Sequence, residues 1–157
     1  MKKATICILK DGARICLGIK KRGFGTGRWN GFGGKVKEGE SFEETALREL
    51  KEESGVTGKS LSKVGEIVFN FPLNSREKDW DQEVHIYFCE SWKGEIIESE
   101  EMKPAWFEVG EIPFDQMWAD DRHWLPFALA GKKVKGTFSF DQNEKILEKI
   151  LEEVEEF

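Results

Sequence analysis

A pattern of glycines, acidic residues and one arginine between positions 34 and 56 constrains this chain more than any other feature. It reads Gly34-x5-Glu40-x7-Arg48-Glu49-Leu50-x-Glu52-Glu53-x-Gly55-Val56. The pattern predicts a helix over 42–53, because Ser41 and Glu44 form a capping box and Gly55 is a natural stop. Apolar residues at helical spacing should face this helix toward the core: Phe42, Ala46, Leu47 and Leu50.

Three carboxylates share one face of that helix. Glu49, Glu52 and Glu53 stand at positions i, i+3 and i+4, where like charges repel one another. A hard divalent cation that prefers oxygen ligands, Mg²⁺ or Mn²⁺, would compensate this repulsion. Arg48 is placed to hold the carboxylates by charge-assisted hydrogen bonds. An isolated E-x-x-E-E would more simply be a solvated acidic face, but this one belongs to a much longer pattern.

A glycine-rich segment, 23–34, precedes the helix. Its glycines suit positive φ angles or close approach of a ligand, and backbone groups in such segments can approach a metal or a phosphate. Phe24, Trp29 and Phe32 interrupt the segment with side chains that favour burial, so it is not a flexible linker.

The rest of the chain alternates between strand and helix signals. Strands are expected at 4–10 and 14–20 around an Asp11-Gly12 turn, and at 61–71, 82–92, 106–109 and 133–140. A polar loop spans 72–81, and 119–130 is expected to form a short helix. Apolar residues recur at helical spacing near the C-terminus, which predicts a helix over 143–157.

Bulk properties limit the partners and the compartment. The 157 residues fit one domain, and the formal net charge of −6 disfavours a nucleic acid polymer as partner. No apolar run approaches a membrane span or a signal-peptide core. The three cysteines are odd in number and widely separated, which favours buried free thiols. We expect a cytoplasmic monomer that binds a small molecule and no membrane.

The pattern at 34–56 resembles, position for position, the Nudix box of the Nudix (MutT-type) hydrolases. The resemblance implies an α/β fold, an α/β/α sandwich around a mixed β-sheet, with 1–157 as a single Nudix hydrolase domain. It implies that Glu49, Glu52 and Glu53 bind Mg²⁺ together with Gly33, and that Glu40 lies nearby. Glu52 or Glu53 would also help to activate water.

Longer segments, 20–25, 27–36, 64–69 and 117–121, are similar to a Nudix subfamily of animals that hydrolyses oxidised purine nucleoside triphosphates such as 8-oxo-dGTP. The similarity implies roles for seven residues in substrate binding. Three would hydrogen-bond the purine edge, one would stack on the base, two would line the pocket and one would lie near the ribose and phosphates: Asn30, Asp120 and Asp121; Trp118; Phe24 and Phe69; Lys20.

Adjacent aspartates support a base-reading role on physical grounds. Two close carboxyls repel, so one should keep its proton and offer a donor beside an acceptor. Without the resemblance, a helix N-cap followed by an acid in the first turn explains Asp120 and Asp121 better. Glu101 matches an acid near the metal in related enzymes, so it is either a catalytic helper or an ordinary loop charge.

Three functions remain open at this point. The first is hydrolysis of an oxidised purine nucleoside triphosphate to the monophosphate and pyrophosphate. The second is a Nudix pyrophosphatase for another X-linked nucleotide such as ADP-ribose. The third is a non-catalytic nucleotide sensor, against which the complete set of charged residues in the box argues. By the point at which the similarity resumes, the loop at 72–81 is longer than in the animal subfamily, and we expect it to adjoin the pocket, where it could change the base preference.

Overall fold

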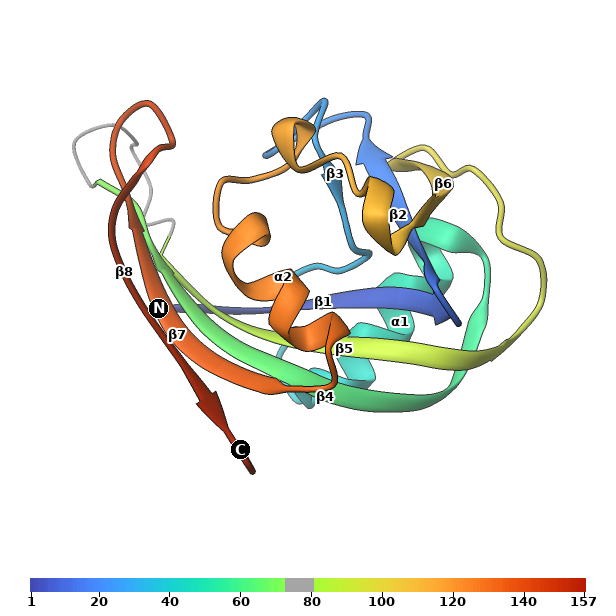
Figure 1. The fold of residues 1–157 in the computed structure, drawn as a ribbon. Coiled ribbons are helices and arrows are strands. Elements are labelled where there is room, and N and C mark those ends of the chain that lie inside the picture. Colours follow the sequence, from blue (N-terminus) through green and yellow to red (C-terminus); the bar gives the residue numbers. More distant parts are fainter. Residues whose placement is uncertain (73–80) are drawn as a thin grey trace.

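The computed structural model describes residues 1–72 and 81–157, which form a mixed sheet with helices on both faces (Figure 1). The strands of the described residues are β1 (Lys2–Asp11), β2 (Arg14–Lys20), β3 (Trp29–Asn30), β4 (Thr57–Asn70), β5 (Gln82–Lys93), β6 (Met102–Glu108), β7 (Lys133–Phe140) and β8 (Ile146–Val154). The helices are α1 (Phe42–Ser54) and α2 (Asp121–Leu129), with short 3₁₀ turns η2 (Val109–Glu111) and η3 (Phe114–Gln116).

The sheet runs in the order β3-β2-β1-β5-β4-β7-β8, and β6 pairs with β2. The pairs β1–β5 and β4–β7 are parallel, whereas β1–β2, β4–β5 and β7–β8 are antiparallel. The sheet is therefore mixed, and the expected α/β/α sandwich is confirmed. Among the described residues no helix is long and apolar enough to span a bilayer.

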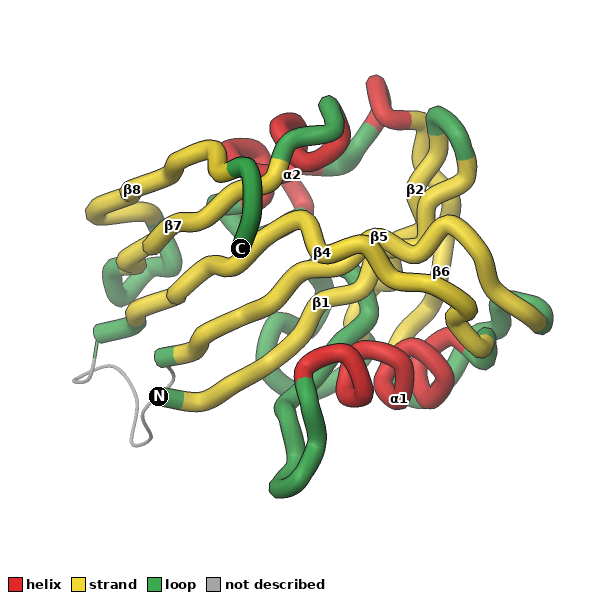
Figure 2. Tube along the Cα trace, turned by 90° about the horizontal axis from the view of Figure 1, so that it is seen from below, coloured by secondary structure: helices red, strands yellow, loops and turns green. Residues whose placement is uncertain are grey.

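Alternation along the central strands separates two hydrophobic clusters. In β1, Ile8 packs on the side of α2, while Cys7 and Leu9 pack on the side of α1. In β5, Val84 and Ile86 face α2 in the same manner. Figure 2 shows α1 on one side of the sheet and α2 on the other. This period of two follows from the pleat, which sends successive side chains to opposite faces.

Helix α1 has the ends that its sequence specifies. Ser41 and Glu44 form the complete capping box, and Gly55 takes a left-handed φ of 85° that only glycine adopts without strain. Ala46 and Leu50 are fully buried as expected. Leu47 is the exception: it is 36% exposed, because it lies at the border of the buried face.

Most other predicted elements are confirmed to within four residues at each end, and the strands at 14–20 and 133–140 match at both ends. The turn at Gly12 has a φ of 59°, and the 119–130 segment forms α2. All three cysteines are free and buried. The polar loop at 72–81 lies outside the described residues except for its two ends, so its length relative to other proteins stays a prediction.

The predicted C-terminal helix over 143–157 is wrong. These residues form the strand β8, which pairs antiparallel with β7. Ile146 and Leu151 are half-buried, whereas Leu147 and Ile150 are exposed, so the apolar residues fall on both faces of a strand. The open edge of β7 offers a row of unpaired backbone groups, and β8 forms hydrogen bonds with them. A helix with this apolar spacing would need a surface against which to bury its apolar face, so the periodicity alone does not decide the conformation.

The strands β1 and β2 pair only near their shared turn and then separate. The glycine-rich segment fills the space beside β1, where Cys7 and Phe32 exchange backbone hydrogen bonds and the Thr5 N–H donates to the Gly34 carbonyl. A Cβ on Gly33 would lie 1.8 Å from the Thr5 carbonyl oxygen, so this position requires glycine. Through Gly33, whose N–H donates to Glu53, this segment contacts the C-terminal part of α1, and it also lines the cavity on the opposite face of the sheet.

Candidate active site

A cavity of about 400 Å³ lies over the α2 face of the sheet. All seven residues predicted to bind substrate line it, together with Gly33 and Glu53. Its described lining also includes residues to which the sequence assigned no individual role: Ala4, Thr5, Ile6, Gly25, Arg28, Gly31, Gly34, Lys35, Phe71, Gln82, Val84, Met102 and Phe140. Seven strands, β1 to β7, the glycine-rich segment and both helices therefore contribute to one site.

Two buried acids stand at one part of this cavity. Asp120 is 4% exposed and Asp121 is 3% exposed. Asp120 occupies the N-cap position of α2 with Asp121 in the first turn, but its side chain makes no capping hydrogen bond. Its Oδ2 instead accepts a 2.8 Å hydrogen bond from the indole Nε1–H of Trp124. The Oδ2 atom of Asp121 has no hydrogen-bond partner among the described residues.

Burial raises the pKa of both acids. The pKa of Asp120 rises to about 6, with the Trp124 hydrogen bond opposing the effect of burial. The pKa of Asp121 rises well above its usual value because the carboxyl is buried and Asp120 lies beside it. A pair of carboxyls that retains one proton in this way offers a donor beside an acceptor.

Aromatic rings form the walls near the acid pair. The Trp118 ring lies 5.1 Å from the Phe24 ring, and Phe71 and Phe140 meet it edge-on at 6.0 and 5.8 Å. The Arg28 guanidinium lies over the indole, 4.0 Å from the ring centre. A planar, apolar ligand would fit between such walls.

Asn30 reaches the cavity from β3. Its Oδ1 accepts a 2.8 Å hydrogen bond from the backbone N–H of Gly31, which fixes the amide group at the cavity wall. Lys20 lines the cavity from the end of β2, and its positive charge favours the ionised form of Glu53. An anionic ligand would meet Lys20 on the side where Glu53 stands.

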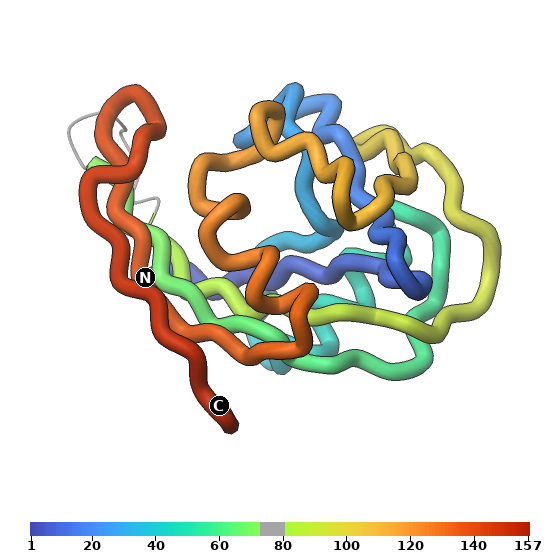
Figure 3. Tube along the Cα trace, in the orientation of Figure 1, coloured from blue at the N-terminus to red at the C-terminus, as the bar shows by residue number. Residues whose placement is uncertain are grey.

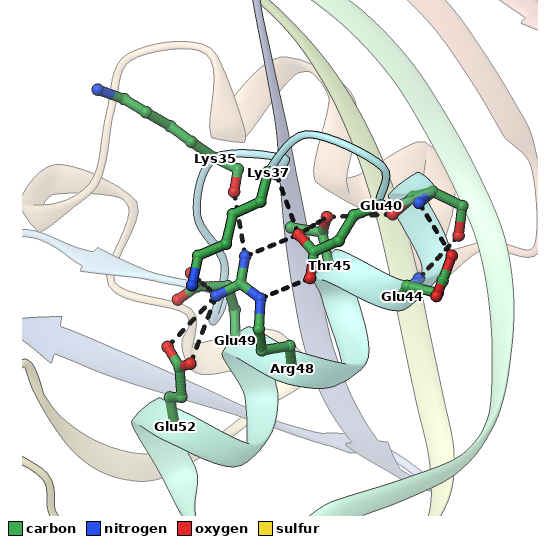
Figure 4. A network of polar contacts seen from close by, with 9 residues as sticks. Lys35, Lys37, Glu40, Glu44, Thr45, Arg48, Glu49 and Glu52 are labelled. Carbon is green, nitrogen blue, oxygen red and sulfur yellow. Dashed lines mark hydrogen bonds and ion pairs between the residues drawn. The ribbon is translucent and has the colours of Figure 1, made fainter.

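Arg48 organises the acidic face of α1 (Figure 4). It donates to both carboxylate oxygens of Glu40, at 2.7 and 3.0 Å, and to Glu49 at 2.7 Å. A longer contact of 3.4 Å reaches Glu52. The hydrogen bonds from Arg48 and from the Lys37 backbone lower the pKa of Glu40 to about 2. Glu40 is therefore a permanently charged anchor for the arginine.

Glu53 is buried between α1 and the glycine-rich segment. Its Oε1 accepts a 2.8 Å hydrogen bond from the Gly33 N–H. Burial raises the pKa of Glu53 to about 7, and the nearby charge of Glu49 adds to the increase. Burial also raises the pKa of Glu49 despite its contact with Arg48. The single positive charge of Arg48 therefore does not balance the negative charges of Glu40, Glu49, Glu52 and Glu53, which we call the acidic group.

The donor chemistry of the group suits a divalent cation, which would supply the missing charge through oxygen ligands. The side chains do not yet converge: across residues 1–72 and 81–157, no three acids, histidines or cysteines stand together as ready ligands. Glu49 is turned toward Arg48 and Glu53 toward Gly33. Binding a cation therefore requires the carboxylates to rotate toward one another, which side chains on one helical face can do.

Glu101 lies outside the described cavity lining. Arg22 holds it with two hydrogen bonds of 2.7 and 2.9 Å. The Glu101 charge still acts on Glu53, whose pKa it raises. Glu101 therefore acts on Glu53 through its charge, while its carboxylate is held by the ion pair with Arg22.

Sequence reasoning missed Arg28, Phe71 and Phe140. Phe71 follows Phe69 at a spacing of two, and Phe140 follows Phe138 in the same way, which is the spacing of one strand face. That signal could have identified the two aromatic walls. No local pattern marks Arg28, because its contacts are with residues about 90 and 116 positions away.

Comparison with known proteins agrees with this arrangement. The NUDIX domain family matches residues 1–128. The chain is 47% identical over 155 residues to an oxidized purine nucleoside triphosphate hydrolase of Danio rerio, covering 99% of this chain and 97% of that one. It is 48% identical over 153 residues to the protein of that name from Mus musculus, covering 98% and 96%. The crystal structure of a MutT protein from Bacillus halodurans is similar with a TM-score of 0.83 and 28% identity, covering 97% and 98%.

Proposed function

This chain belongs to the Nudix hydrolase family, and we propose that it hydrolyses oxidised purine nucleoside triphosphates such as 8-oxo-dGTP to the monophosphate and pyrophosphate. The observation that carries the proposal is the composition of one cavity. Asp120, Asp121 and Trp118 stand in it together with Lys20 and Glu53. A nucleotide has the corresponding parts, a planar base with polar edges and an anionic phosphate chain.

The acid pair suits an oxidised guanine. Its edge offers the N1–H and N2 amino donors and the O6 acceptor. Ionised Asp120 can accept from the donors, while protonated Asp121 can donate to the acceptor, since burial and proximity keep its pKa high. Moving the proton between the two carboxyls would match an adenine-like edge. The unpartnered Oδ2 of Asp121 supports this role, because a buried polar atom gains most from a ligand that pairs it.

The acidic face of α1 supports hydrolysis. We propose that Glu49, Glu52 and Glu53, with the Gly33 carbonyl, hold Mg²⁺, with Mn²⁺ as a substitute. A bound divalent cation neutralises the charge of the phosphates and of the leaving group. Arg48 orients Glu49 and Glu52, and Glu52 or Glu53 accepts a proton from the attacking water. Lys20 binds the phosphates, and Glu101, held by Arg22, is proposed as a helper whose charge acts on Glu53.

Two further expectations stay predictions. The first is that the protein is a monomer. The second is that it works in the cytoplasm, for which the three free, buried cysteines are suitable.

A nucleotide panel tests the proposed function. Purified protein with Mg²⁺ should release pyrophosphate from 8-oxo-dGTP much faster than from dGTP or dCTP. Preference for ADP-ribose or another X-linked nucleotide would replace the substrate assignment. Absence of hydrolysis of every nucleotide, with binding retained, would indicate a sensor.

Isotope labelling tests the site of attack. In ¹⁸O-labelled water, attack at the β-phosphorus places the label in pyrophosphate and leaves the monophosphate unlabelled. We expect that result from the resemblance of the chain to the Nudix subfamily described above. Label in the monophosphate would show attack at the α-phosphorus and contradict this part of the proposal.

A further inference from the structure

We infer that Glu144, in the turn between β7 and β8, holds the plane of Trp118 through Arg28 and so determines purine affinity from outside the acidic pattern of helix α1. This inference rests on the proposed role of Trp118 as the base platform. In Figure 3 the β7–β8 hairpin, drawn in red, stands at one end of the molecule. Arg28, Trp118 and Glu144 are far apart in sequence, so only the folded chain brings them together.

The three side chains form a continuous series. Glu144 Oε2 accepts a 2.8 Å hydrogen bond and ion pair from Arg28 Nη1. The Arg28 guanidinium lies over the Trp118 ring, 4.0 Å from its centre. The ion pair is partly buried, with side chains 32% and 29% exposed, so water screens it less than a surface pair.

The turn that carries Glu144 is itself fixed. Asp141 Oδ1 accepts hydrogen bonds from the backbone N–H groups of Asn143 and Lys145, at 2.7 and 3.0 Å. Glu144 adopts a φ of 63°, uncommon for a residue other than glycine. The hydrogen bonds around Asp141 stabilise this backbone conformation, and the glutamate is thereby positioned before any ligand arrives.

The arrangement has two consequences for a base. Arg28 covers one face of the indole and, together with the Phe24 ring 5.1 Å away, restricts rotation of the ring. Arg28 also lines the same cavity as Asp120 and Asp121. Released from Glu144, the guanidinium could turn toward these acids and hold both ionised, which would remove the proton that one of them needs. Glu144 therefore keeps a cation beside the base site without letting it neutralise the acid pair.

The test compares binding and turnover in matched variants. Glu144→Gln and Arg28→Met should each weaken the affinity for 8-oxo-dGMP, measured by calorimetry without metal, by roughly three- to thirtyfold. The KM for 8-oxo-dGTP should rise in parallel, with kcat within about twofold of wild type because neither residue belongs to the acidic face of α1. The control is Asp11→Asn, which breaks a 3.0 Å exposed ion pair with Arg14 at the β1–β2 turn, outside the cavity lining, and should leave both values unchanged.

A charge exchange separates positioning from stability. Arg28→Glu combined with Glu144→Arg restores an ion pair, so its melting temperature should return toward the wild-type value. It places a carboxylate over Trp118, so the affinity for 8-oxo-dGMP should remain weak. Recovery of both quantities would show that the pair is only structural and would overturn the inference, as would wild-type affinity in Glu144→Gln.

Failure of the proposed function would be visible separately. A wild-type protein that binds 8-oxo-dGMP but releases no pyrophosphate would contradict the activity and leave the role of Glu144 to be decided by the affinities. A wild-type protein that binds no purine nucleotide would overturn both proposals.

Discussion

The indole N–H of Trp124 donates a 2.8 Å hydrogen bond to the Asp120 carboxylate one helical turn before it, and both side chains are buried. The bond uses one carboxylate oxygen and fixes the orientation of the other. It also favours the ionised form of Asp120, and the indole lowers the pKa of Asp121 in the same direction. Burial opposes this on both carboxyls, and a pair that keeps one proton offers one donor and one acceptor at neighbouring positions.

Trp124→Phe should raise the pKa of Asp120, because the hydrogen bond that stabilises its charged form is lost. Since ionised Asp120 is the form proposed to bind the base, the acid side of the kcat/KM profile should move to higher pH. Loss of the bond should also lower the free energy of unfolding by about 1–3 kcal/mol. Kinetics between pH 5 and 9 and urea denaturation measure the two effects. An unmoved pH profile would contradict the proposed role.

Asp120→Asn should lower kcat/KM for 8-oxo-dGTP at least about tenfold, since an unpaired buried group costs about 1–3 kcal/mol. The variant keeps the shape and still offers an oxygen to Trp124, but it cannot share a proton with Asp121. Steady-state kinetics check this, with Asp115→Asn as an exposed control. An unchanged value would leave the protein as a Nudix hydrolase of unspecified substrate.

Asp121→Asn should make the protein more stable than wild type as the pH rises. A carboxyl with a raised pKa retains its proton in the folded chain after the unfolded chain has released it. Its stabilising effect is complete below the unfolded pKa, near 3.8, and is lost as pH rises toward and past the raised folded value. The variant should therefore match wild type most closely near pH 4 and exceed it by about 1 kcal/mol or more at pH 8. Melting curves of both proteins across this pH range measure the difference in their stability. A difference that does not change with pH would refute the buried-charge interpretation.

Glu53→Gln should reduce Mg²⁺-dependent turnover by about two orders of magnitude or more while the fold persists. Glutamine can still accept the Gly33 N–H, but it removes a charge from the acidic face. Without Mg²⁺ the variant should melt no lower than wild type, and Mg²⁺ should raise its melting temperature less. Glu43→Gln, on an exposed position of the same helix, is the control. Full activity of folded Glu53→Gln would exclude the proposed catalytic acids.

Arg48→Lys should lower kcat about tenfold or more, because a lysine cannot bind Glu40 through two hydrogen bonds and reach Glu49 at once. Because lysine keeps the positive charge, a lower kcat would measure the loss of the hydrogen-bond geometry around Arg48. Arg122→Lys supplies a matched control on an exposed ion pair. Wild-type kcat in Arg48→Lys would show that the orientation of Glu49 does not limit the reaction.

Local chemistry explains which elements were predictable. Helix α1 carries a capping box at one end and a glycine stop at the other, so both ends are specified within the segment itself. The strand β8 is different, because its conformation depends on the open edge of β7 rather than on its own periodicity. Leu147 and Ile150 stay exposed, which no local rule for amphipathic segments anticipates.

The candidate site shows the same division. Asn30, Asp120 and Asp121 could be named from the resemblance, and the structure brings all three to one cavity. The Trp124 hydrogen bond, which the Asp120 side chain accepts in place of a capping bond, depends on side-chain packing. The orientation of Glu49 toward Arg48, and of Arg28 toward Trp118, likewise arises from side-chain geometry that spacing alone does not encode.

The glycine-rich segment beside β1 has a consequence for how this protein can change. Helix α1 packs against one face of the sheet, while the acid pair and the aromatic walls belong to the other, and the segment with Gly33 joins the two. Substitutions among the base-binding residues can therefore combine almost additively with substitutions on the far side of α1. A lineage could exchange the nucleobase that it selects while inheriting its hydrolytic machinery unaltered.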